Sequence, residues 1–220
     1  METISRLEIT GCQGISLGNT FYQTSPQARR LALLLPGRGY SCSMPVLFYP
    51  ARWFSSRGAD VLTIEYGFSQ PGQAMPALGG EDLLHWLAAD AAAALQAGLR
   101  AGDYSEVVLA GKSIGTLALS QLLTALPSGP AFSFLWLTPL FKHPALREAL
   151  LRARPRSLFV QGSGDPHYDP HWFAEMQTAC AAQALLIPGA DHSLEFGGDF
   201  PAAFAALQTL LAELSAFTGW

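Results

Sequence analysis

The sequence predicts an α/β protein whose core is an open, mostly parallel β-sheet with helices on both faces. Short apolar runs, rich in leucine and β-branched residues, end in glycine, proline or polar clusters, and longer segments with helical spacing separate them. The runs are apolar at nearly every position, as is typical of parallel strands buried on both faces. Regular alternation of strands and helices then favours a parallel sheet that helices cover on both sides.

Six strands and six helices are expected in this arrangement. We predict strands at 31–36, 60–66, 106–111, 132–138, 157–162 and 183–188, and helices at 43–57, 80–98, 113–126, 143–153, 170–182 and 200–216. The segment before Leu31 alternates in character and is punctuated by glycines, which predicts one or two antiparallel strands that lead into the sheet.

Length and composition indicate one domain over residues 1–220. Half of the 220 residues are apolar and 14% are charged, so the chain has ample material for a core on both faces of a sheet. The 17 acidic and 13 basic residues give a formal net charge of −4, and no basic run is long enough to neutralise a line of phosphates. Nucleic acid is therefore not an expected partner.

The cysteines and the N-terminal segment predict a cytoplasmic protein. Cys12, Cys42 and Cys180 are odd in number and widely spaced, which fits neither a disulfide framework nor a metal-binding knuckle. The first residues show no positive segment followed by an apolar stretch, and no window reaches the roughly 18 apolar residues that span a bilayer. We therefore expect reduced thiols and no membrane partner.

A GxSxG pentapeptide, GKSIG at 111–115, stands where a buried strand passes into an amphipathic helix. A serine on so sharp a turn takes strained backbone angles and brings the flanking chain close, so Gly111 and Gly115 supply the small residues that the turn needs. The turn lifts the Ser113 hydroxyl clear of the sheet. It also places the Ile114 amide at the helix N-terminus, where it can stabilise an oxyanion.

A nucleotide-binding loop is the competing interpretation, because Gly111, Lys112 and Ser113 also match the end of GxxxxGK[ST]. That motif needs a glycine at position 106, where this chain has Glu106, and a loop where this chain has the apolar run VVLA. The sequence therefore favours Ser113 as a nucleophile over a phosphate-binding loop.

A serine hydroxyl is a weak nucleophile at neutral pH, so it needs a neighbouring base and a carboxylate that holds this base in the right tautomer. His192 follows the last predicted strand, and Asp165 follows the strand before it. Both positions lie at strand carboxyl ends, as Ser113 does, so the three can converge at one edge of the sheet. We predict His192 as the general base and Asp165 as the acid that orients it.

Asp169 and Asp191 are the alternatives for the acid. Asp169 precedes a proline and has the pattern of a helix N-cap, and Asp191 must fold back to reach the ring of the next residue. The alternating Asp165, His167, Asp169 and His171 can also be drawn as metal ligands, but alternate residues of an irregular loop need not share a face. We expect neither a metal nor a cofactor.

The loop LLLPGRGYS at 33–41 is the candidate source of a second oxyanion donor. Gly37 and Gly39 permit a turn that directs the Arg38 amide inward, so the Arg38 and Ile114 backbone N–H groups are predicted to form the oxyanion hole. The loops at 38–45, 67–80 and 138–145 are expected to supply the pocket.

Together the segments GKSIG, GSGDPHYD, PGADH and PGRGY resemble the α/β-hydrolase superfamily, in the expected order from Leu31 to the C-terminus. The likeness is greatest to small, lidless members such as the dienelactone hydrolases. Two features differ from the common pattern: Pro36 stands where a histidine is usual before the oxyanion loop, and only about one helix separates the strands at 132–138 and 157–162, where many esterases and lipases insert a cap.

The resemblance implies a serine hydrolase that works through an acyl-enzyme without a cofactor. The expected substrate is a small soluble carboxylic ester or thioester. A non-catalytic scaffold that acts as a binding or regulatory module is the alternative, because fold does not fix function.

Overall fold

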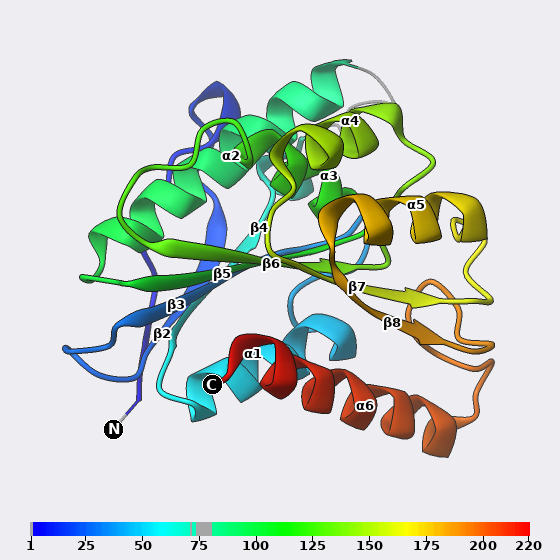
Figure 1. Cartoon of the computed structure of the whole chain (residues 1–220). Helices are drawn as coiled ribbons and strands as arrows, with labels where there is room; N and C mark the ends of the chain where they lie inside the picture. The colour runs from blue at the N-terminus through cyan, green and yellow to red at the C-terminus, as the bar shows by residue number, and fades with distance from the viewer. Residues whose placement is uncertain (1, 71, 74–80) are drawn as a thin grey trace.

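The six apolar runs and two strands of the N-terminal segment form one eight-stranded sheet in the computed structural model, which describes residues 2–70, 72–73 and 81–220 (Figure 1). The strands are β1 Thr3–Ser5, β2 Gly18–Gln23, β3 Arg30–Leu35, β4 Asp60–Glu65, β5 Glu106–Lys112, β6 Ala131–Leu137, β7 Ser157–Gly162 and β8 Gln183–Ile187. The helices are α1 Pro45–Ser56, α2 Glu81–Arg100, α3 Ile114–Leu122, α4 Pro144–Ala153, α5 Pro170–Cys180 and α6 Phe200–Thr218. Short 3-10 turns lie at Cys12–Gly14 and Gly67–Ser69.

The strand order is β1-β2-β4-β3-β5-β6-β7-β8, and β5 lies inside the sheet between β3 and β6. The two N-terminal strands run antiparallel, with β2 paired to β4, whereas β3 to β8 are all parallel. Parallel order brings the carboxyl ends of β3, β5, β7 and β8 to one edge, where loops build sites. This is the predicted α/β architecture, and the antiparallel N-terminal strands are confirmed.

Helices cover both faces of the sheet, as Figure 1 shows. The helices α2, α3, α4 and α5 lie on one face, over a buried core that includes Leu33, Leu109 and Trp136. The helices α1 and α6 cover the other face, over a second core that includes Leu34 and Val108. Alternate residues of the same strands thus supply both cores, which explains why the strands are apolar at nearly every position.

The predicted strands and helices all form, with boundaries that differ by a few residues. The largest difference is at the C-terminal end of α3, which ends at Leu122 rather than at 126. Pro127 disfavours helical backbone at the residue before it, and this helix gives way to a turn. The connection between β6 and β7 contains α4 alone, so no large cap is inserted there.

The helix α6 is unusually apolar. Among the described residues it alone is long and apolar enough to cross a membrane, with a mean hydropathy of 1.3, and 28% of that window is buried. Leu207, Leu210, Leu214 and Phe217 are buried in the core below the sheet. In this structure α6 therefore covers the sheet, and two of its large apolar side chains, Phe200 and Phe204, are exposed at the surface.

Candidate active site

Ser113 stands on the sharp turn between β5 and α3. Its backbone angles, φ 54° and ψ −117°, lie in a region that non-glycine residues rarely adopt. Serine at a helix N-cap ordinarily accepts a hydrogen bond from a backbone amide of the first turn, yet Ser113 makes no such capping bond. Its hydroxyl is therefore not engaged in stabilising the helix.

The two flanking glycines allow this turn because the backbone passes very close to them. A Cβ atom on Gly111 would lie 2.4 Å from the carbonyl oxygen of Gly115, and one on Gly115 would lie 2.5 Å from that of Leu35. Both neighbours are backbone atoms, so a side chain at either position forces the main chain to move. The turn of the nucleophile therefore requires glycine at both positions.

Replacing Gly115 with alanine is expected to lower the free energy of unfolding by about 1–3 kcal/mol, because the added methyl group overlaps the Leu35 carbonyl. The matched change Gly98→Ala on α2 adds a better helix former and meets only the ends of two side chains, Leu31 at 3.1 Å and Leu62 at 3.4 Å, so it is expected to be tolerated. Urea unfolding of both variants measures the difference. Equal losses in the two variants would show that the close approach at the turn carries no special cost.

Asp165 and His192 lie on two loops that pack backbone against backbone at the ends of β7 and β8. A Cβ atom on Gly162 would lie 2.1 Å from the Ala190 carbonyl oxygen, and the Gly164 amide donates to that same oxygen at 2.9 Å. This approach brings Nδ1 of His192 to 2.6 Å from Oδ2 of Asp165. The second ring nitrogen, Nε2, is left to accept the proton of a nucleophile.

The Asp165 carboxylate is buried, with 4% of the residue exposed, and both of its oxygens accept hydrogen bonds. The Gln161 side-chain amide donates to Oδ2 at 2.6 Å, and the His167 backbone N–H donates to Oδ1 at 2.7 Å. Burial raises the pKa of Asp165, but the His192 hydrogen bond, the His167 N–H and the charge of His192 outweigh it, so the pKa lies below its ordinary value. The carboxylate therefore stays ionised at neutral pH.

Ser113 and His192 are joined indirectly in this structure. Within the described residues the Ser113 hydroxyl makes no hydrogen bond to the His192 ring, a contact that often tightens only when substrate binds. The connection runs through the neighbouring Lys112, whose Nζ donates to the His192 carbonyl oxygen at 2.9 Å. The histidine loop is thus held directly beside the turn that carries the serine.

The two predicted oxyanion donors flank the same turn. Ile114 is the first residue of α3, where an amide has no acceptor inside its own helix. The loop after β3 closes through the Gly37 amide, which donates to the Tyr40 carbonyl at 3.0 Å and leaves Arg38 at the exposed tip. A Cβ atom on Gly37 would lie 3.4 Å from Cβ of Ser113, so this loop lies against the serine.

The two alternative acids accept hydrogen bonds from backbone amides elsewhere in the structure. Asp169 caps α5, and its side chain accepts hydrogen bonds from the His171 and Trp172 amides. Asp191 accepts from the Ser193 and Glu195 amides at 2.7 and 3.0 Å, and so shapes the turn after the histidine. Within the described part of the chain, neither carboxylate forms a hydrogen bond or an ion pair with His192.

His167 lies next to His192. From the sequence, His167 is a candidate only as a metal ligand. Its ring lies 5.0 Å from the His192 ring, centroid to centroid, in an edge-on arrangement. Burial and the charge of His192 lower the pKa of His167. A neutral His167 beside His192 does not oppose formation of a charged imidazolium there.

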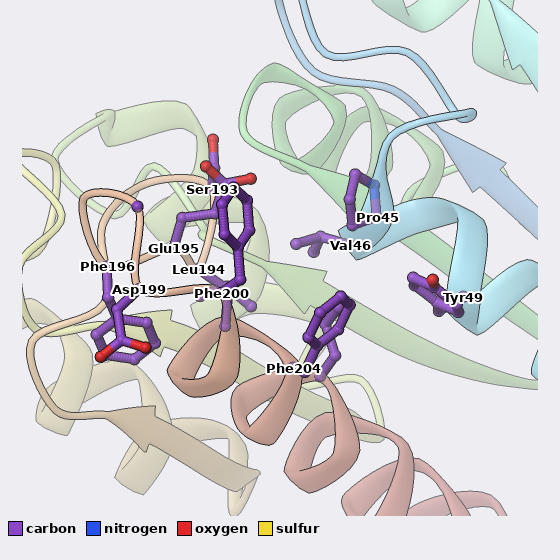
Figure 2. A pocket seen from close by; sticks show the side chains of 13 residues that line it. Pro45, Val46, Tyr49, Ser193, Leu194, Glu195, Phe196, Asp199, Phe200 and Phe204 are labelled. Atoms are coloured by element: carbon purple, nitrogen blue, oxygen red, sulfur yellow. The ribbon is translucent and has the colours of Figure 1, made fainter.

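An apolar pocket of about 290 Å³ opens beside the histidine loop (Figure 2). Its walls are the first turns of α1, the segment after His192 and the first turns of α6. Figure 2 shows Phe200 and Phe204 projecting from α6 toward the rim and Val46 facing them from α1. The lining residues are Pro45, Val46, Tyr49, Ser193, Leu194, Glu195, Phe196, Gly198, Asp199, Phe200, Ala203, Phe204 and Leu207.

This pocket differs from the sequence-based expectation. Of the three loops predicted to supply a pocket, only 38–45 contributes among the described residues, through Pro45, and the segment 193–200 and α6 were not predicted. In the loop at 67–80, residues 71 and 74–80 lie outside the described residues. The aromatic residues of 193–204 carry no motif that marks them as pocket walls before the loop and helix are placed.

Comparison with solved structures identifies the fold. No family model matches the sequence, and no curated protein shows significant sequence similarity to it. The chain is similar over its full length to a protein of unknown function from Agrobacterium tumefaciens described as a candidate α/β hydrolase, with TM-score 0.78, 18% identity and 97% of that chain covered.

Two further structures agree. An esterase from Pyrococcus furiosus gives TM-score 0.73 at 11% identity, over 98% of this chain and 91% of its own. A lidless α/β serine hydrolase from Xanthomonas campestris gives TM-score 0.70 at 18% identity, over 98% and 93%. The chain therefore has the α/β-hydrolase fold without a large cap, as its sequence motifs indicated.

Proposed function

We propose that this protein is a serine hydrolase that cleaves carboxylic esters or thioesters through an acyl-enzyme. The observation that carries the proposal is the combination of a strained, uncapped serine at the strand-to-helix turn and a histidine whose Nδ1 is bonded to a buried carboxylate. Structural neighbours that are described as esterases and serine hydrolases support the same reaction class.

The proposed reaction has two halves, acylation of Ser113 and hydrolysis of the acyl-enzyme, and the same residues act in both. The Ser113 oxygen attacks the substrate carbonyl carbon while its proton passes to Nε2 of His192, and Asp165 stabilises the resulting imidazolium. The oxyanion is met by the Arg38 and Ile114 amides. When the intermediate collapses, the leaving alcohol or thiol takes the proton from His192. Water then attacks the acyl group while His192 takes its proton. Return of this proton to the Ser113 oxygen releases the carboxylic acid and restores the free serine.

The apolar pocket supports an apolar acyl group as part of the substrate. It begins one residue after His192, at Ser193, and its α1 wall begins at Pro45, a few residues beyond the oxyanion loop at 33–41. Both walls thus continue from loops of the candidate active site. Small apolar cavities with few polar groups bind apolar substrate moieties. The protein is also proposed to act on a soluble small molecule in the cytoplasm.

Fluorophosphonate labelling tests the proposed function directly. The probe phosphonylates an activated serine, so the wild-type protein is expected to be labelled, and mass spectrometry of a digest is expected to place the label on Ser113. Hydrolysis of p-nitrophenyl esters and acyl-thioesters by the same preparation then separates ester from thioester preference. A wild-type protein that neither reacts with the probe nor cleaves these substrates would favour a non-catalytic scaffold.

Filling the pocket is expected to restrict the acyl chain. Ala203→Trp on α6 places a large ring among the lining residues, so kcat/KM for a hexanoyl or octanoyl ester should fall by about 10-fold while the acetyl ester is little changed. Ala205→Trp, at an exposed position outside the lining, is the matched control. A parallel loss on all chain lengths in Ala203→Trp would show that this pocket does not hold the acyl group.

A further inference from the structure

A lysine beside the nucleophile links three parts of the site. We propose that Lys112 is a positioning residue that fixes the histidine loop and the oxyanion loop relative to Ser113. The inference rests on the proposed function and adds to it a group outside the serine, histidine and aspartate. It starts from the place of Lys112 at the end of β5, where the side chain is almost completely buried, with 1% of the residue exposed.

The first link reaches the histidine loop. The Lys112 ammonium donates to the carbonyl oxygen of His192 at 2.9 Å, and it lies 3.5 Å from the Thr138 hydroxyl after β6. The ring of His192 is held at Nδ1 by Asp165, and its backbone is held by Lys112. The imidazole is therefore restrained from two sides, by groups on β5 and on the loop after β7.

The second link reaches the oxyanion loop. The Lys112 ammonium lies 4.3 Å from the centre of the Tyr40 ring, which is the distance of a cation–π contact. Tyr40 in turn closes the loop, because its carbonyl accepts from the Gly37 amide at 3.0 Å and its hydroxyl accepts from the Val46 amide at 3.0 Å. The same side chain thus touches the loop that presents Arg38 and the loop that presents His192.

Burial of this charge is costly, which argues against a role in stability alone. Burial lowers the pKa of Lys112 to about 8, against the opposing charges of Asp165 and Asp191, with which it makes no hydrogen bond in the described residues. An apolar side chain of similar length at this position avoids the cost of burying a single ammonium that has one hydrogen bond at 2.9 Å. A lysine that served only to fill this space would be improved by methionine.

Lys112→Met is the test of this role, and Lys142→Met is the matched control. Lys142 is exposed and donates to the Pro166 carbonyl, so its loss removes one charge near the site without touching Tyr40 or His192. We expect Lys112→Met to lower kcat and the rate of fluorophosphonate labelling by about 10- to 100-fold, with KM changed less than about 2-fold. Its melting temperature should equal or exceed that of the wild type.

The pH profile separates positioning from simple packing. The charged or titratable groups around Lys112 are Asp165, Asp191, His167, His192 and the phenol of Tyr40, whose pKa burial raises to about 12. As pH rises through about 8 the ammonium loses its proton, so wild-type kcat should fall there. Lys112→Arg keeps a positive charge at all these pH values and should retain more activity than Lys112→Met without this alkaline fall.

Three results would overturn the proposal. The first is a Lys112→Met protein that turns over and labels at the wild-type rate. The second is a slower Lys112→Met protein whose melting temperature is also lower than that of the wild type, with a rate that Lys112→Arg does not restore. The third is a fall in kcat at alkaline pH that persists in Lys112→Arg. This result decides the question if Lys112→Met does not unfold cooperatively. Failure of the wild-type protein to label would instead contradict the proposed function.

Discussion

Ser113→Ala is expected to abolish labelling by a fluorophosphonate and to reduce ester hydrolysis by about 10⁴- to 10⁶-fold. The acyl-enzyme requires an oxygen at this position, and no other group at the turn replaces it. The residual rate is expected to come from the oxyanion amides and from substrate binding alone. Because alanine keeps the same strained backbone and the serine makes no capping bond, the melting temperature should change little.

A serine at the opposite edge of the sheet provides the control. Ser128 is exposed between α3 and β6, away from the carboxyl ends of the strands, and Ser128→Ala should label and turn over as the wild type does. Intact-mass measurement after labelling gives the stoichiometry, and p-nitrophenyl acetate gives the rate. Undiminished labelling of Ser113→Ala would remove this serine from the mechanism.

The fold could be predicted because its signals are local. The run at 107–110 is apolar throughout, and the GKSIG segment that follows requires a sharp turn into a helix, so β5, the turn and the start of α3 could be predicted from neighbouring residues alone. The end of α3 is less clear from sequence, because its leucines continue beyond the point where Pro127 and the turn before it end the helix.

The contacts that hold the site together could not be predicted in this way, because they join distant segments. Lys112 and His192 are 80 positions apart, and no spacing rule connects them. The requirement for glycine at position 162 is set by the Ala190 carbonyl, a neighbour only once β7 and β8 are paired. Placement at strand ends predicts which residues share an edge, but packing decides which atoms meet.

The bond between Asp165 and His192 gives the second large expected effect. Asp165→Asn places an amide where Oδ2 now accepts from the His192 ring and from the Gln161 side chain. The ring must then offer an unprotonated Nδ1, so its proton moves to Nε2 and the base cannot accept a proton from Ser113. A fall in kcat of about 10³- to 10⁴-fold is expected, with KM little changed.

Asp169→Asn and Asp191→Asn make the same chemical change at the two alternative acids. Asparagine caps helices about as well as aspartate, so Asp169→Asn should retain both the α5 cap and the activity. The acid is assigned to the wrong residue if Asp169→Asn loses as much kcat as Asp165→Asn does. The same holds if Asp191→Asn loses more kcat than Asp165→Asn.

Stability measurements across pH give an independent check on Asp165. Its pKa is lower in the folded protein than in the unfolded chain, where it is about 3.9, so the carboxylate stabilises the fold above that pH. This contribution is lost as pH falls through the folded pKa. Asp165→Asn should therefore be less stable than the wild type at neutral pH, and the gap should close on acidification, as urea unfolding at a series of pH values can measure. A gap independent of pH would mean that the carboxylate's charge does not stabilise the pair with His192.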